Sequence, residues 1–292
     1  MKKILVPVDF SGHTEITCIY ALEYLRQAGG EIRLFHTYFD QILISDSSFP
    51  DSVGMTTFYN EGLLREVMQM AEKNMNDLKK GLEDRIRSDN LKDINVSTVL
   101  AGGEIEQELK EVCLSYHPDL VIMGMTGKGK NINVWGQVST YIITHAKVPI
   151  LTVPDISGFR GFSRIMFAAD LTDWNTHTVK TILDIFSGVS FHLYCVHFLL
   201  KGKGTDETER MKALGDRFAG EQVRGILSFE LVEVTDDNQK AIDQFATAHS
   251  ISLIAFQPYK HNFLYNLFTR NITKKNLFAT NIPLLAIPAV QT

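Results

Sequence analysis

The sequence has few of the features that mark secreted, zinc-bound or membrane-spanning proteins. Its three cysteines, Cys18, Cys113 and Cys195, lie far apart and show no CxxC or Cys/His spacing, so we predict reduced core thiols rather than disulfides or a zinc site. No run reaches the ~18 apolar residues that span a bilayer, and the opening MKKILVPVDFSG has too few apolar residues for a secretory leader. A cytoplasmic protein without a membrane partner is predicted.

An excess of positive charge is also missing. The chain has 29 Lys and Arg residues against 34 Asp and Glu, a formal net charge of −5, which gives no electrostatic reason to expect nucleic acid as a partner. The composition, 45% hydrophobic and 22% charged, is that of a chain that folds. At 292 residues the chain has about twice the length of an ordinary domain, so two domains are expected.

Short apolar runs alternate with helical patterns through the first half. The run from Lys3 ends at Asp9 and Ser11, a residue typical of helix caps, and the helix that follows stops at Gly29. Further strands are predicted at 31–39, 94–100, 120–123 and 149–154, and helices at 64–82, 104–116 and 138–146. Strands that alternate with helices predict a parallel sheet covered on both faces.

The same series then begins again. Three segments repeat earlier ones in order: 163–172 repeats 2–11, 191–198 repeats 32–39, and 282–288 repeats 148–154. Asp170 and Thr172 stand where Asp9 and Ser11 stood, at an offset of 161 residues, and the later offsets are 159 and 134. Self-similarity of this kind predicts two related structural units, the second of them shorter.

We place the two predicted domains at 1–156 and 157–292. The linker 155–161 is short and contains glycine, so the domains are expected to pack together. The loop 40–62 has no counterpart in the second copy. A surface insertion is the favoured interpretation, and a cover over a site is the alternative.

Glycines cluster after the fourth predicted strand, at positions 124, 127, 129 and 136. In an open α/β sheet the ligand crevice lies beyond the carboxyl ends of the strands, so Asp9 and Gly124 are predicted to be neighbours. Glycines let backbone N–H groups turn toward an anion, and a helix starting near Gly136 offers its positive end to phosphate. Asp9 suits a ribose or base donor, or else caps the first helix.

Two general phosphate-binding patterns fit this segment poorly. The P-loop pattern requires Ser or Thr, a Mg²⁺ ligand, where Asn131 stands. The Rossmann fingerprint requires GxGxxG after the first strand, which is followed here by a single glycine. A dinucleotide is therefore not expected, and a nucleotide hydrolase using the near P-loop remains an alternative.

A third pattern is a family resemblance. The segments ILVPVDFS, LFHTY, VIMGMTGKG and GQVSTYIITHAKVPILTVP, with the weaker second copy, resemble a tandem universal stress protein over nearly the whole length. The resemblance implies a Rossmann-like α/β fold of the adenine nucleotide alpha hydrolase type. It implies two open parallel five-stranded sheets in strand order 3-2-1-4-5, paired through their fifth strands as an intrachain pseudo-dimer. Association of two chains stays open.

The resemblance also implies ATP, alone or with Mg²⁺, as the ligand of the first domain. The implied contact residues are Pro7, Asp9, Thr37, Met123, Gly124, Thr126, Gly127, Gly129, Gly136, Gln137, Val138 and Ser139. The family motif is Gly-x2-Gly-x9-Gly followed by Ser or Thr. Here eight residues separate Gly127 from Gly136, and Gln137 takes the Ser/Thr place, where its amide can still donate.

No glycine follows Gly225, so the second domain is predicted not to bind ATP in the same way. His36 and His145 have no evident nucleophile beside them, and no general base is placed near Gly124, so at most weak ATPase or autophosphorylation is expected. The favoured hypothesis is an ATP-binding stress-response regulatory protein. The alternative is a scaffold of the same fold that binds no nucleotide.

Overall fold

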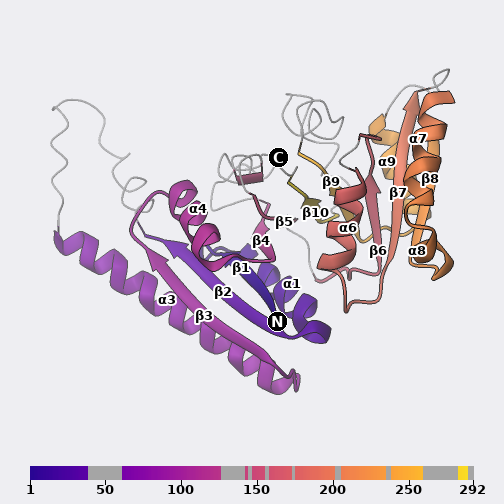
Figure 1. Ribbon diagram of the computed structural model, residues 1–292. Helices are drawn as coiled ribbons and strands as arrows, with labels where there is room; N and C mark the ends of the chain where they lie inside the picture. Colours follow the sequence, from indigo (N-terminus) through magenta and orange to yellow (C-terminus); the bar gives the residue numbers. More distant parts are fainter. Residues whose placement is uncertain are drawn as a thin grey trace, which may run out of the picture.

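The computed structural model shows one ten-stranded sheet with helices on both faces (Figure 1). It describes residues 1–38, 61–125, 142–143, 147–154, 158–172, 175–200, 205–234, 238–258 and 282–288. The predicted loop 40–62 lies outside these residues up to position 60, and of the predicted helix 138–146 only 142–143 are described, in helical conformation.

The first half contains the predicted elements that fall on described residues, most of them within a few residues of their expected bounds, although the helix predicted at 64–82 extends to Ser88. Its strands are β1 (Lys2–Pro7), β2 (Gly30–Thr37), β3 (Ile94–Ala101), β4 (Leu120–Gly124) and β5 (Ile150–Val153), and its helices are α1 (Gly12–Ala28), α3 (Glu61–Ser88) and α4 (Ile105–Tyr116). Gly29 ends α1 with φ +62°, and its N–H donates to the carbonyl of Leu25. The positive φ at this C-cap suits glycine and is the stop that the glycine predicted.

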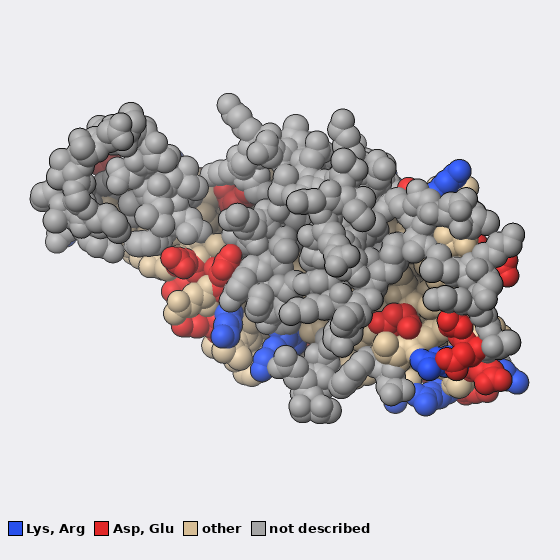
Figure 2. Space-filling view, turned by 90° about the horizontal axis from the view of Figure 1, so that it is seen from above, with Lys and Arg blue, Asp and Glu red and all other residues tan. Residues whose placement is uncertain are grey.

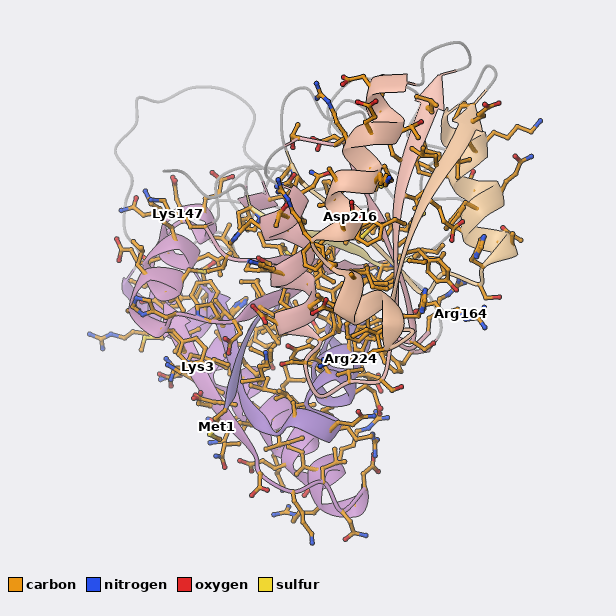
Figure 3. The ribbon with its side chains drawn as sticks, turned by 45° about the vertical axis from the view of Figure 1, so that its right-hand side comes forward. Met1, Lys3, Lys147, Arg164, Asp216 and Arg224 are labelled. Carbon is orange, nitrogen blue, oxygen red and sulfur yellow. The ribbon has the colours of Figure 1, made fainter. Side chains whose placement is uncertain are left out.

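The second half repeats this series. Its strands are β6 (Arg164–Ala168), β7 (His192–Leu200), β8 (Leu227–Val234), β9 (Leu253–Phe256) and β10 (Leu284–Ala286), and its helices are α6 (Asn175–Ile185), α7 (Thr205–Asp216), α8 (Ala219–Val223) and α9 (Asn238–Ala248). Lys3 and Arg164, labelled in Figure 3, hold equivalent places near the start of β1 and β6. The domain boundary itself stays a prediction.

The strand order is β3-β2-β1-β4-β5-β10-β9-β6-β7-β8, so each half has the predicted order 3-2-1-4-5. The fifth strands β5 and β10 pair antiparallel, with Leu285 opposite Leu151, whereas strands within each half pair in parallel. The predicted pairing through the fifth strands is confirmed. The two expected sheets are therefore continuous, because each covers an edge of the other.

One offset in the predicted repeat was wrong. Ile32 lies opposite Ile4 in the first half, and Leu193 lies opposite Ile165 in the second. The second strands are thus related by 161 residues, as the first strands are, and not by 159. Side chains in a strand alternate with a period of two, so a slip of two residues leaves the apolar pattern intact and the sequence does not reveal it.

Two hydrophobic clusters run through both halves, one on each face of the sheet. The first joins α1, α3, α6 and α7 to alternate strand residues such as Ile4 and Ile165. The second joins α4 and α9 to the strand residues that face the other side of the sheet, such as Leu5 and Met166. On the outer surface in Figure 2, the described acidic and basic side chains lie beside one another rather than in separate fields.

Aromatic side chains join the two halves beneath the sheet. Phe162, just before β6, lies with its ring centroid 5.9 Å from Tyr20 and 6.1 Å from Tyr24 of α1, and 5.4 Å from Phe186 at the end of α6. The hydroxyl of Tyr24 donates to the carbonyl of Ile185 at 2.6 Å. The halves therefore share a packed interior as well as a sheet, as the short linker predicted.

The three thiols are free, with Cys18 and Cys195 buried and Cys113 half-buried. Burial, with a smaller contribution from Glu15, raises the pKa of Cys18 to about 12, and burial raises the pKa of Cys113 to about 11 and that of Cys195 as well. The prediction of free thiols is confirmed, and two of the three are core residues.

We expect these thiols to react slowly with Ellman's reagent at pH 8, at least ~10-fold slower in the native chain than in urea, because only the thiolate attacks. The raised pKa of Cys18 also makes the free energy of unfolding depend on pH. Folding favours the protonated thiol, and this contribution is complete below the ordinary thiol pKa of 9.0. It is lost as the pH rises from 9.0 toward about 12. Urea unfolding followed from pH 7 to 11 would show this. Equal rates in the native and unfolded chain would contradict the prediction.

Candidate functional site

The described site residues lie together at the carboxyl ends of three adjacent strands. Pro7 is the last residue of β1, with Asp9 two positions beyond, and Thr37 is the last residue of β2. Met123 and Gly124 end β4, which lies on the other side of β1 from β2. Parallel strands present their carboxyl ends at one edge, so these five residues surround the end of β1, where the crevice of such a sheet lies.

The rest of the predicted site falls outside the described residues. This applies to Thr126, Gly127, Gly129, Gly136, Gln137, Val138 and Ser139. Their contacts with a ligand, and the choice between the phosphate-loop patterns, stay predictions.

Asp9 both stabilises the turn and keeps one oxygen unsatisfied. Its Oδ1 accepts from the backbone N–H of Ser11 at 2.9 Å and from the hydroxyl of Thr14 at 3.2 Å, which is an Asx-type turn leading into α1. Within the described part of the chain its Oδ2 is buried and has no hydrogen-bond partner. The sequence left two roles open for Asp9, a helix cap or a ligand contact. Because one oxygen holds the turn and the other has no partner, the two roles are compatible.

Ser11 occupies the cap position that the sequence predicted, but its hydroxyl does not cap the helix. It is the N-cap residue of α1, and its carbonyl accepts from the N–H of Thr14 at 3.1 Å, but its side chain makes no capping hydrogen bond. Among the described residues its hydroxyl is buried without a partner. Sequence reasoning missed Ser11 as a site residue, because serine before a helix ordinarily indicates a cap.

His36 supports the turn after β1. Its Nδ1 lies 2.7 Å from the carbonyl of Val8, so this nitrogen carries the proton and donates, and its ring lies 4.4 Å from that of Phe10. Phe10 has φ +56°, a left-handed backbone that this packing holds in place. The structural interpretation of His36 is therefore supported, and its equivalent His197 contacts the carbonyl of Ala169 in the same way at 2.9 Å.

The equivalent carboxylate in the second half is satisfied differently. Oδ1 of Asp170 accepts from the N–H and the hydroxyl of Thr172, at 3.2 and 2.8 Å, and from the amide of Asn175 at 2.7 Å. Asn175 stands where Thr14 stands in the first half. The hydroxyl of Ser11 therefore makes no bond to Asp9 in the first half, whereas the hydroxyl of Thr172 bonds to Asp170 in the second.

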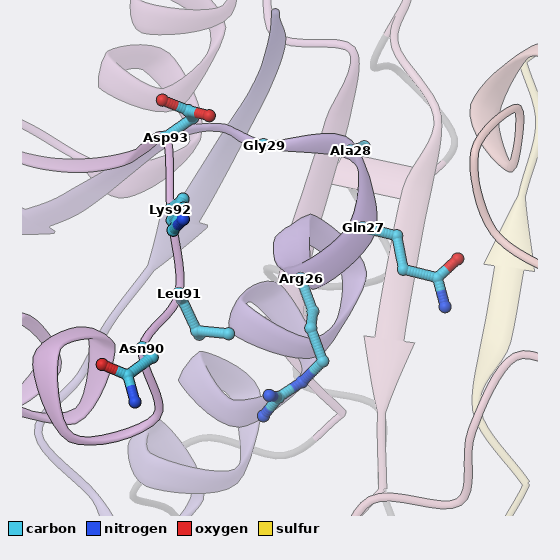
Figure 4. Close-up of a pocket in the computed structure, with 8 residues that line it drawn as sticks. All are labelled: Arg26, Gln27, Ala28, Gly29, Asn90, Leu91, Lys92 and Asp93. Carbon is cyan, nitrogen blue, oxygen red and sulfur yellow. The ribbon is translucent and has the colours of Figure 1, made fainter.

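A shallow pocket of about 330 Å³ lies at the opposite, amino ends of β2 and β3 (Figure 4). Arg26 lines it, but this guanidinium already contacts Glu23 at 2.7 Å and Asp89 at 3.2 Å. Ligand crevices of parallel sheets lie at the carboxyl ends. The candidate site is therefore the one around Asp9, not this pocket.

The described residues contain no group of three His, Cys, Asp or Glu side chains placed to hold a metal ion. In the same described residues, no helix is long and apolar enough to cross a membrane.

Comparison with known proteins agrees with this architecture. The model of the family described as "Universal stress protein family" matches residues 1–154, just over half of the chain. The chain belongs to the universal stress protein family. One curated member, universal stress protein MJ0577 of Methanocaldococcus jannaschii, is 26% identical over 160 residues, which cover 52% of this chain and 94% of that protein.

Two solved structures match both halves. A universal stress protein from Archaeoglobus fulgidus has a TM-score of 0.67 at 14% identity, covering 98% of this chain and 96% of that one. A putative universal stress protein from Pseudomonas aeruginosa has a TM-score of 0.58 at 13% identity, covering 98% and 91%. At these identities the likeness shows the fold, which is that of universal stress proteins across the whole length.

Proposed function

We propose that residues 1–156 bind ATP at the carboxyl ends of their strands, and that the chain is a cytoplasmic nucleotide-binding regulator of the stress response. Residues 157–292 then serve as the structural partner. The observation that carries the proposal is the pair of buried, unpartnered polar atoms in the described part of the site, Oδ2 of Asp9 and Oγ of Ser11.

A buried polar atom without a partner costs about 1–3 kcal/mol. A ligand that brings hydroxyl or amino donors to the end of β1 removes this cost, and ribose hydroxyls and the adenine amine are such donors. Pro7 and Thr37 lie beside this point, at the ends of β1 and β2, and are the residues that we propose contact the base and its sugar. The family resemblance implies that the glycines after β4 contact the phosphates.

The proposed role is binding rather than catalysis. His36 has its Nδ1 bonded to the carbonyl of Val8, and one oxygen of Asp9 holds the turn. Both groups are thus engaged in holding the turn after β1, as is the Thr14 hydroxyl that bonds to Asp9. This is a structural arrangement and not that of a general base beside a nucleophile. Turnover is therefore expected to be absent or very slow.

Calorimetric titration of the full chain with ATP tests the proposal. We expect one nucleotide per chain, and loss of binding in Gly124→Val, whose branched side chain occupies the approach to the end of β4. Phosphate release followed over hours should stay below one equivalent. Circular dichroism of the variant serves as the folding control. Absence of binding in the wild-type chain would favour a scaffold, and steady release of many equivalents would favour a hydrolase.

A further inference from the structure

Two residues of the second half replace two of the first at matching points. Ile4 lies opposite Leu120, and Ile165 lies opposite Leu253. Four positions beyond each of these partners, Gly124 in the first half is replaced by Gln257 in the second. On the helices, Thr14 is replaced by Asn175, each five residues after the carboxylate. Both replacements put a longer amide side chain where the first half has a small one.

These two amides meet in the interior. The Nδ2 group of Asn175 lies 2.7 Å from Oδ1 of Asp170 and 3.2 Å from Oε1 of Gln257. Its Oδ1 accepts from the N–H of Leu171 at 2.9 Å. Asn175 is 1% exposed and Gln257 3%, so the network fills the interior between the ends of β6 and β9.

The first half has no such network in the described residues. The hydroxyl of Thr14 reaches Oδ1 of Asp9 at 3.2 Å, and Gly124 has no side chain to extend toward it. Oδ2 of Asp9 is left without a partner there. Among the described residues, the first half therefore keeps a buried oxygen without a partner at its strand ends, whereas the second half has two buried amides that bond to each other.

We propose that Asn175 and Gln257 act as a built-in occupant of the second crevice, which closes it to nucleotide. Thr14 and Gly124 are then the residues that keep the first crevice open, so this pair of positions determines which half binds. The inference rests on the proposed function for the first site. This reason is separate from the lack of glycines in the second half. The missing glycines concern the phosphate loop, whereas the two amides lie at the base of the crevice.

Transfer of the pair tests the inference in one direction. The double variant Thr14→Asn with Gly124→Gln is expected to lower the affinity for ATP at least ~30-fold, a loss of about 2 kcal/mol of binding free energy, while the chain keeps its circular dichroism spectrum and melting temperature. Lys180→Gln, which puts the same kind of amide side chain at an exposed position of α6, is the control and should stay within about threefold of wild type. Wild-type affinity in a folded double variant overturns the inference.

A second measurement needs no nucleotide. Asn175→Thr restores the residue of the first half and removes the amide from the network, so we expect the melting temperature to fall by about 2–6 °C. Lys180→Ala, exposed on the same helix, is the control and should change it little. If wild type binds no ATP but Asn175→Thr is destabilised, the proposed function fails and the closed second crevice stands. An unchanged melting temperature overturns the closed crevice.

Discussion

Asp9→Ala is expected to weaken ATP binding by about 10- to 150-fold, the loss of a hydrogen bond between a donor and a charged acceptor. The expectation follows from Oδ2 of Asp9, which is buried and unpartnered among the described residues and so is available to a ribose or adenine donor. Calorimetric titration of the full chain at fixed salt gives the two dissociation constants.

The second half offers a matched control for this substitution. Asp170→Ala removes the equivalent carboxylate, whose Oδ1 is bonded within the chain to Thr172 and Asn175. Its affinity for ATP should remain within about twofold of wild type, since that carboxylate lies in the half that we propose does not bind nucleotide. Equal losses in the two variants would point to a general loss of structure, and no loss in Asp9→Ala would remove the main support for the site.

Phe162→Ala is expected to lower the free energy of unfolding by about 3–5 kcal/mol, as for other buried aromatic residues. Phe162 is 4% exposed and packs against α1 of the first half and Phe186 of the second. Because it joins the halves, its loss should also broaden the urea transition, with the two halves unfolding less cooperatively.

Urea unfolding followed by fluorescence and by circular dichroism measures both effects. Tyr24→Phe is the control for the same cluster. It removes only the hydroxyl that donates to Ile185, and about 1 kcal/mol is expected. A loss below 1 kcal/mol in Phe162→Ala would show that the cluster does not hold the halves together.

The sequence predicted the strands because apolar periodicity and a motif repeated in order mark them, and their order was what the family resemblance implied. It placed Asp9 and Gly124 at neighbouring strand ends because the ligand crevice of an open α/β sheet lies beyond the carboxyl ends of its strands. It gave the wrong offset for the second strand, since a two-residue slip preserves the alternation of side chains. Backbone pairing resolves that ambiguity and the residue pattern does not.

The sequence was less informative about the polar atoms of the site. Ser11 has the residue type and position of a helix cap, and only the geometry shows that its hydroxyl does not cap. Asn175 and Gln257 are 82 positions apart in the chain, and no local pattern links them. Hydrogen bonds between distant residues depend on the fold as a whole, so they become visible only once the strands are placed.

The antiparallel pairing of β5 with β10 has a consequence for behaviour on dilution. If β5 and β10 belonged to separate chains, the pair would dissociate at low protein concentration. Here the linker joins the two halves and keeps each at a high effective concentration for the other. The two halves should therefore remain joined at nanomolar protein. Because the two halves are parts of one chain and pair with each other, they need not keep the same residues, and under our proposal one half binds nucleotide while the other does not.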